Sequence, residues 1–136
     1  MNQNNENNAV YGNTNPSPED FEKMPVKRFG SVIGLNREQE IYYRQFHAEV
    51  WDGVINRIKA SNIRNYSIYI TEIEGKNYLF SYFEYTGEDY KSDIKAMADD
   101  ESTKRWWKET DPCQFQLPSR KAGDQWSSME MVFFTE

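Results

Sequence analysis

The sequence contains one histidine, His47, and one cysteine, Cys113, among its 136 residues. One cysteine excludes an internal disulfide bond, and one histidine excludes the two-histidine and three-histidine zinc sites of metalloenzymes. A hydrolase with a serine, histidine and acid triad would depend on His47 alone. If an imidazole carries out acid–base chemistry in this chain near neutral pH, that imidazole belongs to His47.

Positive charge is also scarce, because 16 Lys and Arg face 22 Asp and Glu and the net charge is −6. This balance argues against a nucleic acid or an acidic membrane as the partner, since both attract an excess of cations. No stretch approaches the roughly 18 apolar residues that a membrane helix needs, and no secretory signal is recognisable. We therefore expect a cytoplasmic protein without a membrane partner. Aromatic residues, in contrast, are abundant at 15%.

The first 25 residues differ in composition from the rest of the chain. They hold seven asparagines and three of the five prolines, but no tryptophan. Such a segment cannot bury enough apolar surface to offset the entropy lost on ordering. We therefore predict a disordered, Asn-rich tail over residues 1–25. Since 38% of the chain is apolar, the remainder has the material for one core, and we predict a single domain over residues 26–136.

Within this domain, the spacing of apolar residues predicts the element order β-α-β-β-α-β. Alternation predicts four strands, at residues 26–34, 63–74, 77–85 and 128–135. Helical spacing predicts one long helix over 37–60 and a second helical region over 87–98 and 100–110. This order is typical of a ferredoxin-like α+β fold. Helices on one sheet face leave the other uncovered, so we expect a second copy to cover it, as in a dimeric α/β barrel.

Tyr43 and His47 lie near the middle of the apolar face of the predicted long helix, at about 100° per residue. Because they are four positions apart, their side chains are neighbours on that face. A titratable ring that faces inward must be hydrogen-bonded or line a cavity, since an unpartnered buried polar group costs about 1–3 kcal/mol. The residues alone leave two interpretations open, a hydrogen-bonded core histidine and a catalytic histidine.

Three further aromatic residues are candidates for a binding site. Trp106 and Trp107 are consecutive in a predicted helix, so they cannot both face the same core. Either one of them lies in a subunit interface, or the pair provides a platform on which a sugar ring stacks. Tyr66 is expected on the sheet surface beneath the helix, as a structural residue or as a ligand contact. Cys113 has no histidine nearby in the sequence, and nothing marks it as a nucleophile.

Five segments resemble, in order and spacing, the L-rhamnose mutarotase family: YYRQFHAEVWDGV, IRNYSIYI, NYLFSYFEY, RWWKETDPCQ and the terminal MEMVFF. The resemblance covers residues 26–135. It implies a ferredoxin-like fold, a homodimer, and interconversion of the α and β anomers of a monosaccharide. The implied substrate is a deoxy-hexose such as L-rhamnose or L-fucose, and the implied reaction uses no metal and no organic cofactor. The Asn-rich tail and the loop over residues 114–125 depart from the family pattern.

The resemblance also implies roles for individual residues. His47 corresponds to the proton donor, and four aromatic residues correspond to positions that contact the sugar: Tyr43, Tyr66, Trp106 and Trp107. A histidine with a pKa near neutral suits this acid–base chemistry. Two alternatives remain open. One is another activity on a dimeric α/β barrel, such as a cofactor-free monooxygenase or a haem-degrading protein; the other is a sugar-binding module without catalysis.

Overall fold

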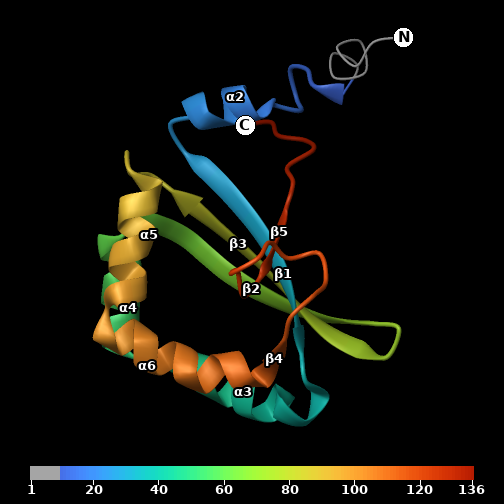
Figure 1. Cartoon of the computed structure of the whole chain (residues 1–136), viewed down its shortest axis with the longest axis vertical. Helices are drawn as coiled ribbons and strands as arrows, with labels where there is room; N and C mark the ends of the chain where they lie inside the picture. The colour runs from blue at the N-terminus through green and yellow to red at the C-terminus, as the bar shows by residue number, and fades with distance from the viewer. Residues whose placement is uncertain (1–9) are drawn as a thin grey trace.

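The computed structural model describes residues 10–136, and residues 1–9 of the predicted tail lie outside the described part. The fold is α+β: a curled antiparallel sheet forms half of a barrel, and helices line one of its sides (Figure 1). The long strands are β1 (Lys27–Leu35), β2 (Ile63–Ile73) and β3 (Lys76–Tyr85). Two short strands, β4 (Gln114–Phe115) and β5 (Ser127–Met129), pair with β1, and the sheet order is β2-β3-β1-β4.

The hairpin between β2 and β3 confirms the predicted turn. Glu74 and Gly75 connect the two strands with φ angles of 51° and 80°. Two consecutive residues with positive φ match the twist of antiparallel strands, and glycine adopts this conformation without steric cost. The two predicted helices that follow are also confirmed, as α5 (Tyr90–Asp99) and α6 (Glu101–Thr110). Asp89 and Asp100 cap them by accepting hydrogen bonds from the backbone N–H groups of Ser92 and Thr103.

The single long helix predicted over residues 37–60 is wrong. The chain forms a 3-10 turn (Arg37–Gln39), then α3 (Glu40–Ala48), and after a break α4 (Asp52–Ala60). The backbone leaves the helix at Glu49 (φ −140°, ψ 79°), and Trp51 precedes α4 in an extended conformation. The Trp51 ring then packs edge-on against both Phe46 and Trp106, at 5.5 and 5.2 Å between centroids. These aromatic contacts stabilise a break that helical periodicity does not reveal.

Both ends of the chain also differ from the predictions. Part of the predicted disordered tail is ordered, because α2 (Pro18–Lys23) is capped by Ser17 and begins with a proline at its first position. The predicted strand over residues 128–135 stops at Met129. Beyond it Val132 and Phe133 are exposed, while the Phe134 N–H donates to the Thr14 carbonyl at 2.8 Å. The two ends therefore contact each other, which local patterns could not predict.

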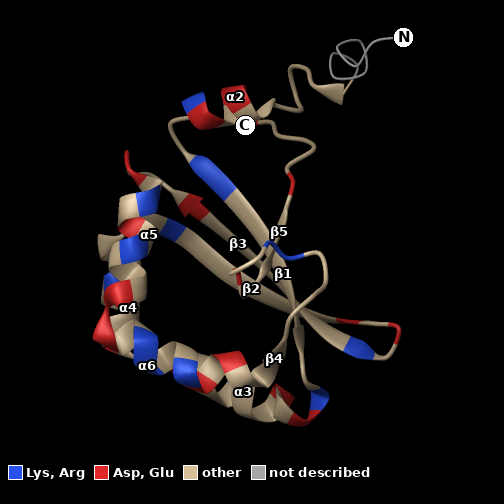
Figure 2. Ribbon diagram, viewed as in Figure 1, with Lys and Arg blue, Asp and Glu red and all other residues tan. Residues whose placement is uncertain are grey.

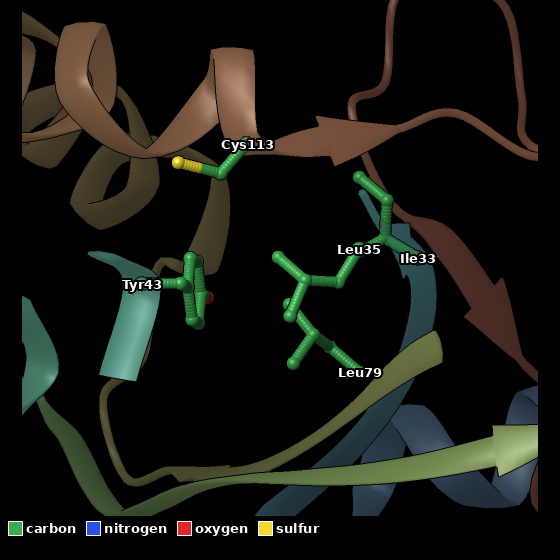
Figure 3. Close-up of a cluster of buried hydrophobic side chains, with 5 residues drawn as sticks. All are labelled: Ile33, Leu35, Tyr43, Leu79 and Cys113. Atoms are coloured by element: carbon green, nitrogen blue, oxygen red, sulfur yellow. The ribbon is translucent and has the colours of Figure 1, made fainter. Parts of the chain in front are cut away.

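The core lies between the sheet and α3 (Figure 3). Its members are Ile33, Leu35, Tyr43, Leu79 and Cys113, all no more than 5% exposed. Ile33 pairs with Leu79 across β1 and β3, so the two side chains lie together on the helix-covered face of the sheet. Tyr43 is the one buried residue of α3 and attaches this helix to the core. Among residues 10–136, no helix is long and apolar enough to cross a membrane.

No helix covers the other face of the sheet (Figure 1). Val32, Phe80 and Tyr69 stand in one row across β1, β3 and β2, and Tyr69 is 62% exposed. Charged residues gather on the helices and near the strand ends, whereas the middle of the sheet is almost free of charge (Figure 2). This row of side chains is called the outer face below.

Gly34 in β1 lies beneath the ring of Phe115, and a Cβ atom there would overlap the ring. We expect Gly34→Ala to lower the free energy of unfolding by about 1–3 kcal/mol, because overpacking at a rigid ring forces the strands apart. Gly30→Ala, on the same face of the same strand, is the matched control. Its added Cβ meets the flexible end of Met129 at 3.0 Å, so urea titration should show a clearly smaller loss. Equal losses would contradict the role of Phe115.

Candidate active site

A cavity of about 640 Å³ lies on the helix-covered side of the sheet, between β2 and helices α3, α4 and α6. Four of the five predicted site residues line it: Tyr43, His47, Tyr66 and Trp106. Apolar residues of α4 and β2, including Val54, Ile58, Ile68 and Ile70, form much of the remaining wall. The structure therefore joins segments far apart in the sequence around one mostly apolar space with a few polar groups, as is usual for small-molecule sites.

His47 is held by a hydrogen bond within its own helix. Its Nδ1 lies 2.9 Å from the Tyr43 carbonyl oxygen, which can only accept, so Nδ1 carries the proton. In the neutral ring Nε2 then has a free lone pair, and the structure gives this atom no partner within the described chain. Burial lowers the pKa of His47 from its ordinary value, and the hydrogen bond to Tyr43 partly opposes that shift. The resting imidazole at neutral pH is therefore neutral, with Nε2 as a proton acceptor.

Tyr43 lies against His47, with ring centroids 4.1 Å apart and ring planes 25° from parallel. This contact is the four-residue neighbour relation that the helical spacing predicted. Burial raises the pKa of Tyr43 well above its ordinary value, so its hydroxyl keeps its proton. Gln114 of β4 donates a long hydrogen bond to this hydroxyl, at 3.5 Å. Tyr43 thus packs one face of the imidazole and presents a neutral hydroxyl at the edge of the core.

The two tryptophans have different environments. Trp106 is 6% exposed, meets the His47 ring edge-on at 5.2 Å, and stacks on Phe46 at 4.2 Å. Trp107 is 37% exposed and is not among the residues that line the cavity. The difference follows from α6, whose buried positions are Thr103, Trp106 and Thr110 on one side of the helix. Trp106 therefore lines the cavity and Trp107 does not, and the sugar contacts of both tryptophans remain predictions.

Tyr66 lies at an irregularity in β2. Between the pairs Arg64–Glu84 and Ser67–Tyr82, two residues of β2 oppose one residue of β3, and Asn65 takes a positive φ of 52°. This bulge lets Ile63 and Tyr66, three positions apart, lie on the same helix-covered face. The Tyr66 ring remains 43% exposed and meets Phe83 edge-on at 5.6 Å. Burial raises the pKa of its hydroxyl, which is therefore a proton donor at neutral pH.

The sequence did not identify several residues that support the site. Phe46 and Trp51 hold Trp106 from two sides, and Gln114 contacts the Tyr43 hydroxyl. The Asn65-Tyr66 pair was the one available signal for the bulge, because asparagine tolerates positive φ. Among residues 10–136, no three His, Cys, Asp or Glu side chains gather closely enough to hold a metal ion.

Known proteins resemble this chain over the region that forms the cavity. A family model described as L-rhamnose mutarotase matches residues 28–135. The chain belongs to the L-rhamnose mutarotase family. It is 32% identical over 87 residues to the L-rhamnose mutarotase of Bacillus subtilis strain 168, covering 64% of this chain and 79% of that relative. It is 31% identical over 85 residues to the Lactiplantibacillus plantarum L-rhamnose mutarotase, covering 62% and 77% of the two chains.

A solved structure shares the fold of this L-rhamnose mutarotase family member. The crystal structure of L-rhamnose mutarotase from Formosa agariphila matches it with a TM-score of 0.60 and 24% identity. The match covers 81% of this chain and 99% of the other. Residues 10–27, which include α2, precede the region that the family model matches.

Proposed function

We propose that this protein interconverts the α and β anomers of L-rhamnose, or of a related deoxy-hexose such as L-fucose, by acid–base ring opening and closure. One observation carries the proposal: the single imidazole of the chain lines a cavity with Nδ1–H bound to the backbone and Nε2 free. The reaction needs one group that takes a proton and one that gives a proton. Family membership supports the same conclusion.

In the proposed cycle, neutral His47 takes the proton of the anomeric hydroxyl at Nε2 while the bond between the anomeric carbon and the ring oxygen breaks. The Tyr66 hydroxyl donates a proton to that ring oxygen, and the aldehyde forms. After rotation about the adjacent carbon–carbon bond, the ring closes on the opposite face of the carbonyl. His47, now an imidazolium, is the proton donor in this half of the cycle, and Tyr66 recovers its proton. Acid–base assistance of this kind contributes about 10²–10⁴-fold per group.

The roles of the other residues follow from their surroundings. Tyr43 keeps the imidazole plane fixed and can hydrogen-bond a sugar hydroxyl, and Trp106 offers an aromatic ring to the apolar side of the sugar. This chemistry uses groups that the chain itself supplies. Because sugars already mutarotate slowly in water, modest assistance by two groups is enough for useful acceleration.

The pH dependence of the reaction tests the role of His47. Burial lowers its pKa below the ordinary value of 6.5, so the active neutral form predominates at and above pH 7. We expect kcat/KM to be level there and to fall as the pH drops through the lowered pKa. The free energy of unfolding should also decrease as the pH falls from 6.5 through the lowered pKa, because in that range His47 takes up a proton in the unfolded chain but not in the folded one. Rates that rise on acidification would contradict this assignment.

Saturation-transfer NMR on the anomeric protons tests the proposed function directly. With the protein present, L-rhamnose or L-fucose should exchange between its α and β signals faster than in buffer alone. Absence of any such acceleration with either sugar would refute the proposal. Binding of the sugar without exchange would instead select the non-catalytic sugar-binding module. A change in the visible spectrum of added haemin would favour the haem-degrading alternative, which needs His47 as an axial ligand.

We also propose a ferredoxin-like topology and a homodimer in the cytoplasm. The strand order β2-β3-β1-β4, with helices between β1 and β2 and after β3, supports this topology. The outer face supports the dimer, since its centre combines exposed Tyr69 with Phe80 and Val32 and a second copy would remove this surface from water. The free thiol of Cys113 is compatible with a reducing compartment.

A charge placed on the outer face tests the dimer. We expect Tyr69→Arg to convert a dimer into a monomer, because burying an unpaired guanidinium between two sheets is strongly unfavourable. Light scattering coupled to gel filtration measures the mass. Ile41→Arg is the matched control, since Ile41 on α3 is 71% exposed and lies away from the sheet. A wild-type monomer, or a dimeric Tyr69→Arg variant, would refute this interface.

A further inference from the structure

The bulge in β2 decides which side of the sheet Tyr66 faces. In a regular strand successive side chains alternate between the two faces, so Ile63 on the helix-covered face would place Tyr66, three positions later, on the opposite face. The extra residue between Arg64 and Ser67 reverses this alternation. Tyr66 therefore lines the candidate active site only while the bulge stays in place.

The same bulge sets the part of the cavity wall that β2 supplies. Its loss would shift the later residues of β2 by one position and turn their side chains to the other face. Ile68 and Ile70, which line the cavity, would then leave it. In the sheet order β2-β3-β1-β4, β2 is at the edge, so β3 is its one strand neighbour among residues 10–136. The strand contacts that fix the bulge therefore come from β3.

Asn65 lies in the bulge and suits its backbone. The φ angle of Asn65 is 52°, in the left-handed region that asparagine enters at a lower cost than most residues other than glycine. Its Nδ2 donates a hydrogen bond to Oε1 of Glu84 on β3, at 2.9 Å. The backbone preference and the cross-strand hydrogen bond of Asn65 thus favour the same conformation.

Glu84 is held in place to accept that hydrogen bond. Its second carboxylate oxygen, Oε2, accepts a hydrogen bond from the Tyr82 hydroxyl at 2.8 Å, so each oxygen has a donor. The hydrogen bond from Asn65, followed by the one from Tyr82, lowers the pKa of Glu84, which is therefore ionised at neutral pH. Hydrogen bonds to an ionised carboxylate are stronger than those between neutral groups. The half-buried Glu84 thus joins the bulge of β2 to β3.

We propose that the hydrogen bond between Asn65 and Glu84 is a positioning contact for the reaction, because it holds the bulge that directs the Tyr66 hydroxyl into the cavity. This inference rests on the proposed function, in which Tyr66 gives a proton to the ring oxygen of the sugar. Asn65 and Glu84 then act through Tyr66 and need no contact with the reacting atoms. Small displacements matter here, since a misplacement of about 1 Å can lower a rate about 10²-fold.

Asn65→Asp tests this contact with the smallest change in shape. Aspartate has nearly the same size and also tolerates a positive φ, but its carboxylate repels Glu84 where the amide donates. We expect kcat for L-rhamnose exchange, measured by saturation-transfer NMR, to fall about 10–100-fold. KM should stay within about threefold of the wild-type value, because the contact acts on the proton transfer and not on sugar binding.

Asn62→Asp is the matched control. Asn62 also has a positive φ, of 63°, and its Nδ2 also donates to a carboxylate oxygen, Oδ2 of Asp93, at 3.0 Å. It does not line the cavity. The same substitution should therefore leave kcat unchanged, even where urea titration shows a lower free energy of unfolding. Equal losses of kcat in Asn62→Asp and Asn65→Asp would overturn the positioning role, since any such lost bond would then have the same effect.

Reversal of the hydrogen bond distinguishes positioning from a direct contact between Asn65 and the sugar. In the double variant Asn65→Asp/Glu84→Gln, the amide at position 84 donates to the carboxylate at position 65, and the amide oxygen still accepts from Tyr82. We expect kcat to recover to within about threefold of the wild-type value, as coupled residues show in double-mutant cycles. If kcat stayed as low as in Asn65→Asp, Asn65 would act on the sugar itself and the positioning role would be overturned.

The Tyr66→Phe background shows whether the contact acts through Tyr66. This variant keeps the ring and removes the hydroxyl, so kcat should fall about 10²–10⁴-fold. Asn65→Asp should then lower kcat no further, whereas additive losses would overturn the inference and leave the mutarotase function standing. An unchanged kcat in Tyr66→Phe would refute the role of Tyr66 and, with it, this inference. If the wild-type protein accelerates exchange of neither L-rhamnose nor L-fucose, the proposed function itself fails.

Discussion

Replacement of His47 by asparagine should lower kcat for anomeric exchange by about 10³-fold, within the range expected for one acid–base group. Asparagine is polar and smaller than the imidazole, but it cannot accept and return a proton near neutral pH. The free Nε2 is the part of His47 that the proposed cycle uses, since Nδ1–H is bound to the Tyr43 carbonyl. Saturation-transfer NMR measures the rate, and far-UV circular dichroism shows whether the fold is kept.

The control for this prediction lies two residues away on the same helix. Gln45 is exposed and belongs to the opposite side of α3, so Gln45→Ala should leave the exchange rate unchanged. The acidic fall in kcat/KM expected for the wild type should also disappear in His47→Asn. If His47→Asn retained the wild-type rate and pH profile, His47 would be a structural residue and another group would carry the proton.

The second large effect is expected from the tryptophan pair. Trp106→Ala should lower the free energy of unfolding by about 3–5 kcal/mol, the usual loss when a buried aromatic ring is truncated. Trp106 is 6% exposed and contacts Phe46, Trp51 and His47, so the remaining cavity cannot close easily. This is a large part of the roughly 5–15 kcal/mol by which a domain of this kind is stable. Urea titration measures the loss.

Trp107→Ala provides the comparison, because it makes the same chemical change one residue later. At 37% exposure, this ring should contribute about 1 kcal/mol or less. Exchange activity gives a second test at Trp106. The conservative Trp106→Phe keeps an aromatic ring at the cavity and should therefore retain more activity than Trp106→Ala. Equal losses of stability at the two positions would contradict the assignment of Trp106 to the interior.

Local relations in the sequence predicted much of the candidate site. Tyr43 and His47 are four residues apart within one helix, so their contact needs only that helix to form. The β2–β3 hairpin was predictable for the same reason, because its turn residues and its alternation are local. The family resemblance implied that Tyr66 and Trp106 belong to the same site as His47, and all three line the cavity.

Tertiary contacts explain what the sequence did not reveal. No proline marks the break at residues 49–51, and the rings of Phe46, Trp51 and Trp106 stabilise it across two helices. Which of Trp106 and Trp107 is buried depends on how α6 packs on its neighbours, and a helical pattern alone does not determine this. Phe21 lies in a segment of polar composition, yet its ring packs edge-on against Phe29 of β1. This contact attaches α2 to the sheet.

The break before α4 also has a consequence for heat inactivation. It leaves α3 as a nine-residue helix with one buried side chain, Tyr43, while the same helix carries His47. Short elements with few buried contacts open more readily than the rest of a domain. A transient opening of α3 would remove both groups from the cavity at once while the sheet stays intact. Activity should therefore be lost on warming before the sheet unfolds, and the α3 amides should exchange with deuterium in step with that loss.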